Sequence, residues 1–516
     1  MTTLAAVGVI PTPSIQYAAI APMLIIFGVG LVGVLVEAFV PRGLRHVTQV
    51  VITLAGIVAA FVSVVVLAGT HRVVVEGAVA IDGPTLFLWG LILALAFLAV
   101  LTIAERALDP GGAFTGSAAA LPGSAAEREV SAAGITATEV FPLTLFAVGG
   151  MMLFPAANDL LTMFVGLEVL SLPLYLMCGL ARRRRLLSQE AAMKYFVLGA
   201  YSSGFFLFGI ALLYGYAGSF RLAAIASAAS SQLGNDGLLL GGMALLTVGL
   251  LFKIGAVPFH SWVPDVYQGA PTPVTGFMAT ATKAAGFGAL IRVLYVALPG
   301  MTWDWRPIMW GVAILTMVVG SVLAVTQNDV KRMLAYSSVA HAGFILTAVI
   351  AATRLGTASV LFYLATYGFA TIGAFAIVTL VRDSAGEATH LSQWAGLGRR
   401  SPVVAGSFAL FLLAFAGIPL TSGFTGKFAV FTAALDAGAA PVVIVGVLSS
   451  AVAAFFYIRV IVVMFFSAPA PDGPTVVIPS AFTSVAVAIG VAVTVVLGVV
   501  PAPILDLANR ASLFVR

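Results

Sequence analysis

Four lysines lie inside long apolar stretches of the sequence, where a charged amine is costly. They are Lys194, Lys253, Lys283 and Lys427, and a fifth lysine, Lys331, opens another such stretch. A charge at the centre of a bilayer costs about 2.5–3.5 kcal/mol on insertion scales, so each amine needs a partner or a use. Because a buried lysine can release its proton while arginine stays protonated, interior lysines predict proton transfer.

The place of each lysine within its stretch separates two interpretations. Lys253 and Lys283 have long, mostly apolar flanks on both sides, which favours a functional role. The alternative is that a long side chain extends to the membrane interface, where its charge is hydrated. This interpretation suits Lys331, and it suits Lys194 because Lys194 lies near the start of its stretch. Lys427 is intermediate, because the boundaries of its stretch are poorly defined.

Glu168 lies squarely inside an apolar stretch and is the predicted counter-charge for an interior lysine. Separating such a pair in a low dielectric favours the neutral form of both groups, which converts a side-chain movement into a proton movement. A static structural ion pair is the alternative. For the interior histidines His260 and His341 we rank proton relay first, a hydrogen-bonded structural role second and a haem held between them third.

Prolines interrupt the stretch that contains Lys253. Pro258 and Pro264 lie in GLLFKIGAVPFHSWVPD, residues 249–265. A proline removes a backbone donor and clashes with the preceding turn, so we predict a helix break near 256–264, around His260. Simple proline kinks that shape packing are the alternative. Carbonyls freed at a real break can bind water or ions.

A second break is predicted in AGIPLTSGFTGKF, residues 416–428, at Pro419 and Gly423. Residues 256–261 align with residues 417–422 at an offset of 161 residues. This offset covers five predicted helices, an odd number that reverses the direction of the chain across the membrane. The two regions therefore predict inverted repeats, the architecture of many ion carriers.

Membrane-spanning helices must position these residues. A hydrocarbon core about 30 Å thick requires about 20 apolar residues as helix. The expected fold is an all-α polytopic membrane protein with two inverted five-helix repeats, spans 4–8 and 9–13, and discontinuous helices 7 and 12. We expect about fourteen spans, at 17–40, 47–69, 84–104, 139–157, 159–180, 190–217, 239–264, 271–298, 307–326, 332–351, 357–381, 402–433, 440–466 and 478–500.

These spans divide into four predicted parts. Residues 1–138 form three helices and a Gly/Ala-rich loop, residues 139–298 the first repeat, residues 299–466 the second repeat, and residues 467–516 a last helix and tail. Thirteen lysines and arginines fall in the loops on one side, against six on the side of the termini. The positive-inside rule therefore places both termini outside and makes Arg182–Arg185 a topology anchor.

Composition excludes several classes of protein. The chain is 61% hydrophobic and only 9% charged, against roughly 25% charged residues in soluble domains. Its single cysteine, Cys178, excludes disulfide frameworks, thiolate zinc sites and cysteine-held iron–sulfur clusters. The sequence lacks nucleotide-binding glycine motifs and basic blocks interleaved with aromatics. We therefore expect no cofactor, metal site or redox centre in this chain, and no nucleic-acid partner.

Longer motifs around these residues resemble a known family. The segments FVGLEVLSLPLYLM, EAAMKYFVLGAYSSGFFLFGIALLYG, VKRMLAYSSVAHAGFIL and AGIPLTSGFTGKF are similar to bacterial NADH-quinone oxidoreductase subunit N. The 253–287 segment is the most specific motif, and the resemblance covers about residues 139–466. This family provides antiporter-like membrane subunits of respiratory complex I.

The resemblance implies a role for each residue. Glu168 is similar to a fifth-helix glutamate that pairs with the lysine of the broken seventh helix, here Lys253. Lys283 resembles the relay lysine of the eighth helix, and Lys427 the lysine facing the outward half-channel. Lys194 matches a lysine frequent in the sixth helix of subunit N, and His341 resembles a central relay group. We assign both to the predicted proton relay.

The resemblance also implies the setting of this chain. It predicts a proton-translocating subunit of a bacterial inner-membrane enzyme whose NADH, FMN, iron–sulfur clusters and quinone are bound by other subunits. The implied partners are subunits M, L, K and J and the lipid bilayer. A subunit of a multi-subunit sodium/proton antiporter shares this fold and is the alternative, although the run GAYSSGFFLFG favours complex I. A structural scaffold is the third hypothesis.

Overall fold

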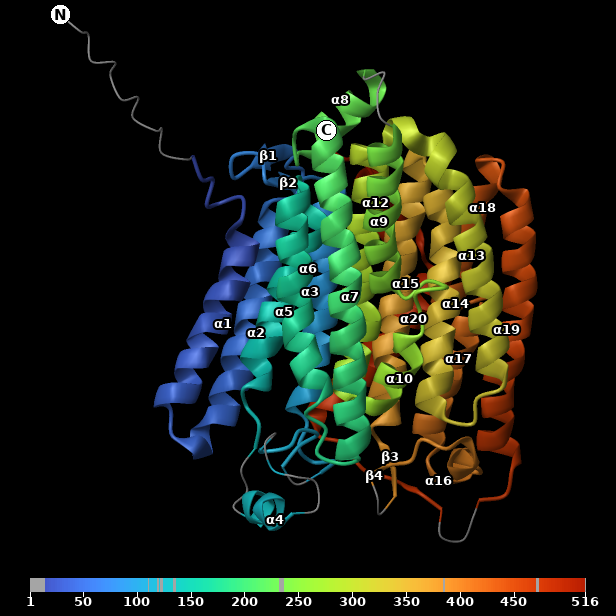
Figure 1. The fold of residues 1–516 in the computed structure, drawn as a ribbon. Helices are drawn as coiled ribbons and strands as arrows, with labels where there is room; N and C mark the ends of the chain where they lie inside the picture. Colours follow the sequence, from blue (N-terminus) through green and yellow to red (C-terminus); the bar gives the residue numbers. More distant parts are fainter. Residues whose placement is uncertain are drawn as a thin grey trace, which may run out of the picture.

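The structure, a computed structural model, describes residues 14–109, 111–117, 120, 124–132, 136–231, 236–383, 386–469 and 473–515. Helices dominate this part of the chain (Figure 1). The α-helices are α1 (Ala21–Phe39), α2 (Arg42–Val66), α3 (Gly83–Ala104), α4 (Ala125–Ala132), α5 (Val140–Ala156), α6 (Leu160–Cys178), α7 (Arg185–Ala217), α8 (Leu222–Ser231), α9 (Asp236–Ile254), α10 (Trp262–Gly269), α11 (Thr272–Phe277), α12 (Lys283–Arg292), α13 (Thr302–Val325), α14 (Val330–Ile350), α15 (Arg354–Val378), α16 (Leu397–Arg400), α17 (Pro402–Ala416), α18 (Ser422–Asp436), α19 (Ala440–Phe466), α20 (Ala481–Val499) and α21 (Ala502–Arg510).

Short strands and non-α turns complete the described chain. Two antiparallel sheets are formed, one of β1 with β2 and one in the order β4-β3-β5. The strands are β1 (Arg72–Val74), β2 (Val79–Ile81), β3 (Val381–Asp383), β4 (Gly386–Glu387) and β5 (Thr475–Val476). The π-helices are η1 (Met278–Thr282) and η2 (Val293–Ala297), and the 3-10 helices are η3 (Pro299–Met301) and η4 (Leu391–Trp394).

Twelve helices within the described residues are long and apolar enough to cross a membrane. One of these spans, Thr272–Ala297, is made of four consecutive helices, α11, η1, α12 and η2. The predicted spans 139–157 and 402–433 correspond to shorter helices, α5 and the pair α17 and α18. The all-α polytopic membrane fold is thus confirmed, while the number of fourteen crossings stays a prediction.

The core lies in the helices that carry the interior charges. The spans Thr272–Ala297 and Val330–Ile350 are completely buried, and Arg354–Val378 is nearly so. By contrast, α1, α7 and α20 bury about a third or less of their most apolar segments, as expected of helices at the edge of a bundle. Three central helices therefore offer an environment shielded from both water and lipid.

Helix α9 ends at Ile254 and α10 begins at Trp262, so this span is interrupted at residues 255–261. Pro258 lies inside the interruption, but Pro264 lies in the first turn of α10. The prediction that Pro264 takes part in the break is therefore wrong. A proline is tolerated in the first turn because its missing N–H would have no partner within the helix there.

The second interruption lies between Ala416, the end of α17, and Ser422, the start of α18. Pro419 lies inside it, whereas Gly423 belongs to the first turn of α18, contrary to its predicted place in the break. The two half-helices α9 and α17 end alike, with left-handed glycines at Gly255 (φ +74°) and Gly417 (φ +83°). These glycines are 162 residues apart, so the structure shifts the predicted repeat alignment by one residue.

The chain enters α1 and leaves α21 at the same end of the bundle (Figure 1). At the opposite end lie α4, β3, β4 and α16, next to the arginine-rich connections. The predicted solvated loop at 108–138 contains the helix α4, which its composition did not predict, and parts of that loop lie outside the described residues.

Candidate functional site

Lys253 is held at the end of α9 between two neighbouring helices. Its Nζ donates hydrogen bonds to Ser171 Oγ of α6 at 2.8 Å and to Tyr195 Oη of α7 at 3.4 Å. The same amine lies 5.6 Å from the centroid of the Tyr195 ring. Neutral hydroxyls and an aromatic face therefore surround this amine.

No hydrogen bond or ion pair joins Glu168 to Lys253 in the structure. It lies on α6 one helical turn before Ser171, and no ion pair within 4.0 Å joins it to a described residue. Its Oε1 is buried and has no hydrogen-bond partner within the described chain. Lys253 instead donates to the Ser171 hydroxyl, one turn after Glu168. The predicted Glu168–Lys253 ion pair is therefore not formed in this structure.

Lys283 follows directly after the π-helix η1, an element frequently found at functional sites. Its Nζ donates to the carbonyl oxygen of Ser338 at 2.6 Å and lies 5.5 Å from the centroid of the Tyr367 ring. Lys253 and Lys283 line one cavity of about 10 Å³ together with Tyr267. That is about the room required by a single water.

His341 lies in α14 within an aromatic cage. Its Nδ1 is 2.7 Å from Tyr363 Oη, and its Nε2 is 3.4 Å from Tyr457 Oη. The imidazole also lies 4.8 Å from the Tyr367 ring, which receives the amine of Lys283 on its face. Two hydroxyls thus contact the two ring nitrogens, an arrangement suited to passing a proton through the ring.

Lys427 extends from α18 back to the end of α17. Its Nζ donates to the carbonyl oxygens of Phe415 at 2.8 Å and Ala416 at 2.9 Å, and to Ser450 Oγ at 2.7 Å. These three acceptors match the three donors of an ammonium group. The amine also lies 4.8 Å from the Phe344 ring centroid. The end of α17, where the second break begins, therefore supplies two of the three ligands of this lysine, and α19 supplies the third.

Together these groups form a row through the centre of the bundle. The row joins Lys253 to Lys283 by a shared cavity, and Lys283 to His341 by the Tyr367 ring. The rings of Phe344 and Phe415 both pack against His341. The Lys427 amine lies over the Phe344 ring and donates to the Phe415 carbonyl. The four members of the row are each at most 5% exposed. Each amine and the imidazole are consequently buried with polar partners.

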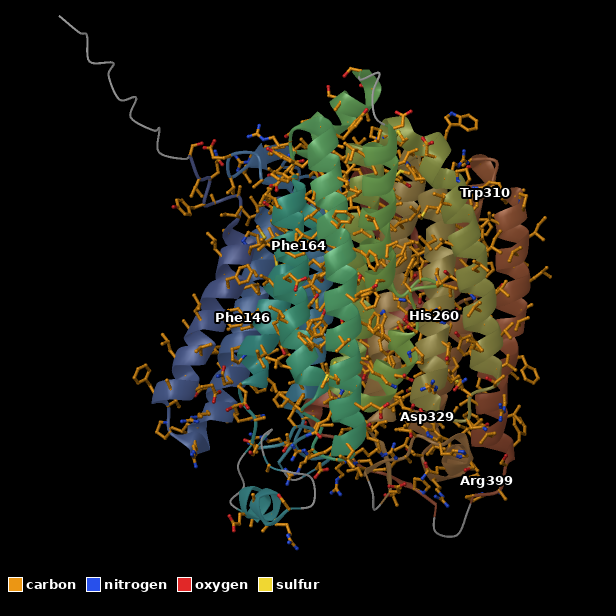
Figure 2. All side chains as sticks on the ribbon, in the orientation of Figure 1. Phe146, Phe164, His260, Trp310, Asp329 and Arg399 are labelled. Carbon is orange, nitrogen blue, oxygen red and sulfur yellow. The ribbon has the colours of Figure 1, made fainter. Side chains whose placement is uncertain are left out.

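Lys194 and His260 lie apart from this row. The Lys194 side chain is 40% exposed, and it forms ion pairs of 2.7 Å with Glu190 and with Asp265 of α10. Asp265 also pairs with Arg332 of α14 at 2.6 Å. His260 lies in the first break (Figure 2), half-buried and with Nδ1 unpartnered among the described residues.

Sequence reasoning missed the hydroxyls that contact the buried charges. Tyr195 directly follows Lys194, and Ser171 lies three residues after Glu168, which places it on the same helix face. Ser450, which follows Ser449, and Tyr457 lie in a mostly apolar stretch that matches no motif. Among the described residues no group of three or more His, Cys, Asp or Glu side chains could hold a metal ion.

The fold and the buried lysine row define an antiporter-like membrane protein. The family described as NADH:quinone oxidoreductase/Mrp antiporter matches residues 157–453. NADH-quinone oxidoreductase subunit N of Rhodococcus opacus is 66% identical over 98% of both chains. The chain belongs to the NADH-quinone oxidoreductase subunit N family, as its sequence predicted.

Two solved structures place this fold among related assemblies. A chain of respiratory complex I from Thermus thermophilus with bound aureothin is 33% identical, with a TM-score of 0.76 over 95% of this chain and 99% of that one. A chain of the Mrp complex from Dietzia is 21% identical, with a TM-score of 0.82 over 96% of this chain and 97% of that one. The second likeness shows the fold alone, so fold does not separate the two functions.

Proposed function

We propose that this chain translocates protons as a membrane subunit of a bacterial NADH-quinone oxidoreductase. The observation that carries the proposal is the buried row of Lys253, Lys283, His341 and Lys427, connected by a cavity, hydroxyls and aromatic rings. Each group can exist in a neutral form, which an arginine in the same place could not. Family membership supports this function over sodium/proton antiport.

In this proposal a proton passes along the row in one direction. Lys253 receives it and passes it to Lys283 through the shared cavity. Water would carry it past the Tyr367 ring to His341, because a ring face cannot transfer a proton. His341 then exchanges the proton through its two ring nitrogens. Water would carry it past the Phe344 ring to Lys427, which releases it beside the second break. The electrons that drive the cycle travel through other subunits, since we assign no redox centre, metal or cofactor to this chain.

Glu168 acts as the switch in this proposal. Its unpartnered Oε1 lies one turn from the hydroxyl that holds Lys253. Movement of the Lys253 amine from Ser171 toward Glu168 would pair the two charges and hold the proton. Movement back would favour its release toward Lys283. Lys194 has a minor positioning role, because its partner Asp265 on α10 also pairs with Arg332.

The breaks support a function within an assembly. Pro258 in the first break is exposed on the isolated chain, and Leu420 in the second is 71% exposed. Non-helical backbone at membrane depth is tolerated only where protein or a water-filled cavity covers it. We therefore propose that neighbouring membrane subunits, such as M, L, K and J, cover these surfaces.

Several finer features belong to the same proposal. The chain would lie in the bacterial inner membrane, with both termini on the outer side and the arginine-rich loops in the cytoplasm. Residues 139–298 and 299–466 would form the two inverted repeats, preceded by residues 1–138 and followed by residues 467–516. NADH, FMN, iron–sulfur clusters and quinone would bind elsewhere in the complex.

The test is proton pumping by the intact complex in inverted membrane vesicles. We expect Lys253→Ala and Lys427→Ala each to abolish NADH-driven acidification while the complex still assembles. Normal acidification in both variants would overturn the relay. Proton exchange that requires sodium and proceeds without NADH would instead identify an antiporter. Unchanged flux in both variants, combined with loss of the complex on deletion of the chain, would identify a scaffold.

A further inference from the structure

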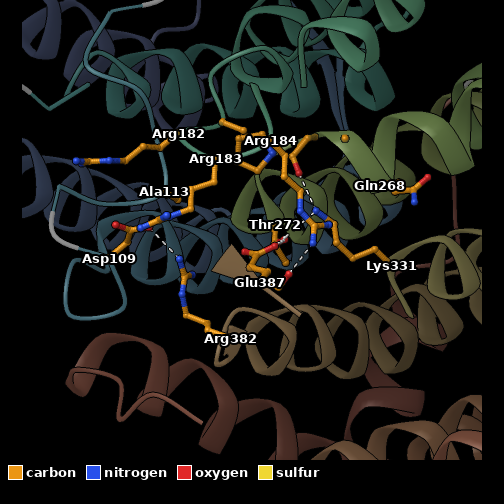
Figure 3. Close-up of a pocket in the computed structure, with 14 residues that line it drawn as sticks. Asp109, Ala113, Arg182, Arg183, Arg184, Gln268, Thr272, Lys331, Arg382 and Glu387 are labelled. Carbon is orange, nitrogen blue, oxygen red and sulfur yellow. Dashed lines mark hydrogen bonds and ion pairs between the residues drawn. The ribbon is translucent and has the colours of Figure 1, made fainter. Parts of the chain in front are cut away.

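A polar cavity of about 60 Å³ lies at the arginine-rich end of the bundle, outside the lysine row (Figure 3). Its walls come from five separate connections, before α4, before α7, between α10 and α11, at the start of α14, and at β3 and β4. Roughly four to six water-sized spheres fit such a volume. The cavity is therefore several times larger than the one of about 10 Å³ that Lys253 and Lys283 share.

Positive charge dominates the lining of this cavity. Two carboxylates, Asp109 and Glu387, also face it, which leaves a surplus of three positive charges. Such a surplus in a partly buried space attracts an anion strongly, because screening by water is weak there. The five cationic side chains of the lining are Arg182, Arg183, Arg184, Lys331 and Arg382.

Two of these cations, Arg182 and Arg184, form no ion pair with a carboxylate of the described residues. Asp109 is shared by Arg183 at 2.8 Å and Arg382 at 2.9 Å. Among the described residues, Arg184 reaches only neutral acceptors, the backbone oxygen of Glu387 and the Thr389 hydroxyl, both at 3.0 Å. Figure 3 shows its guanidinium beside Glu387 and Lys331.

Two further cations keep unused donors. Lys331 is buried, and its Nζ makes one hydrogen bond, of 2.8 Å to the carbonyl oxygen of Ala270, with Glu387 3.8 Å away. An ammonium has two donors left after one such bond. No hydrogen bond or ion pair of the described residues engages the Arg182 guanidinium. The sequence-based expectation that Lys331 reaches out to the interface is therefore wrong.

We propose that this cavity binds the phosphate group of a lipid headgroup or of a soluble phosphate compound. A tetrahedral oxyanion with several oxygens matches convergent donors from Arg184 and Lys331, and guanidinium groups suit phosphate geometry. Its charge offsets the surplus left by Asp109 and Glu387. A topology anchor alone requires neither a buried lysine nor a cavity.

The test uses the intact complex and two sources of phosphate. Thermal stabilisation by inorganic phosphate is compared with that by chloride at equal ionic strength. Retained lipid is measured by native mass spectrometry after transfer into nanodiscs of phosphatidylcholine with or without phosphatidylglycerol. Stabilisation by inorganic phosphate without retained phosphatidylglycerol supports a soluble source, and the reverse result supports a lipid headgroup.

Arg184→Gln should weaken binding of the effective source about ten-fold, as expected for loss of one charge-assisted hydrogen bond. Arg182→Gln removes a charge that has no partner in the described part of the chain, so it should weaken binding while leaving the fold intact. Arg399→Gln, in α16 at the same end of the molecule but outside the cavity lining, is the matched control and should bind like the unchanged chain. Absence of phosphate binding from either source, or equal binding in all four chains, would overturn the proposal.

Discussion

The two helix breaks differ in which side chains bond the backbone amides and carbonyls that lose their helical partners. In both breaks, a left-handed glycine ends the first half-helix with the same pair of backbone hydrogen bonds. In the first, the amides of residues 255 and 256 donate to the carbonyls of Phe252 and Leu251, respectively. In the second, the amides of residues 417 and 418 donate to the carbonyls of Ala414 and Leu413, respectively. In the first break, the indole of Trp262 adds a bond to the Phe252 carbonyl, and Thr316 accepts from the amide of Val257. Neutral side chains therefore stabilise the first break.

The second break uses a charge for the same purpose. The carbonyls of Phe415 and Ala416 bind the ammonium of Lys427, so the break and the relay group depend on each other. When Gly255 is aligned with Gly417, Lys253 aligns with Phe415. The first lysine thus lies on the helix end, and the second faces the equivalent end from the following half-helix. We infer that the second lysine has the larger structural role.

The largest expected contrast is between Lys427→Met and Lys253→Met. Both should abolish pumping, but Lys427→Met leaves the buried Phe415 carbonyl without its donor, at about 1–3 kcal/mol. The Ala416 carbonyl keeps the Ser450 hydroxyl as a donor at 3.2 Å. Loss of Lys253 leaves the Ser171 hydroxyl its bond to the Leu167 carbonyl. Thermal dissociation of the complex should therefore occur at a clearly lower temperature for Lys427→Met alone. Equal destabilisation by the two substitutions would contradict the comparison.

The second contrast concerns the two glycines. A side chain at either position costs about 1–2 kcal/mol in the left-handed region. A Cβ on Gly417 would also lie 2.9 Å from Cδ of Lys427, whereas one on Gly255 would meet a methyl group of Val263 at 2.8 Å. Gly417→Ala should therefore lower the pumping rate more than Gly255→Ala at similar stability. The measurement is acidification per NADH oxidised, and the reverse order would refute the prediction.

In the third contrast, the larger effect is expected at Lys253 and the smaller one at Lys427. Ser171→Ala removes the shorter of the two hydrogen bonds of Lys253, whereas Ser450→Ala leaves Lys427 its two carbonyl ligands. A loss of about 1.4 kcal/mol corresponds to a rate about ten-fold lower, which we expect for Ser171→Ala. Ser450→Ala should lower the rate only about two-fold. Initial pumping rates at saturating NADH measure both, and Ser171→Thr, which keeps a hydroxyl, serves as the control.

The smallest effect is expected at Lys194, outside the row. Its ion pairs are exposed, and such pairs contribute about 0–1 kcal/mol. Asp265 keeps its partner Arg332 when Lys194 is replaced. Lys194→Gln should therefore leave pumping within about two-fold of the unchanged complex. A complete loss of pumping in an assembled complex would move Lys194 into the relay.

Some of these features could be read from local sequence and others could not. Apolar length predicted the helices, because backbone groups in hydrocarbon must be satisfied within the helix itself. Pro258 and Pro419 marked the interruptions, because the chemistry of proline acts on its own turn. Pro264 and Gly423 were misplaced, since a few residues decide whether such a residue breaks a helix or begins one. The helix α4 carried no apolar signal and was missed.

The sequence by itself determined that lysines would lie in apolar helices and that two of those helices would be interrupted. Both properties follow from the composition of short segments. Only the tertiary structure decided which groups contact each amine, because Ser171, Tyr195, Ser338 and Ser450 come from other helices. It likewise left Glu168 apart from Lys253 and gathered five connections around one basic cavity. Hydrogen bonding is short-ranged, so the partners of a buried charge are fixed by packing and not by distance along the chain.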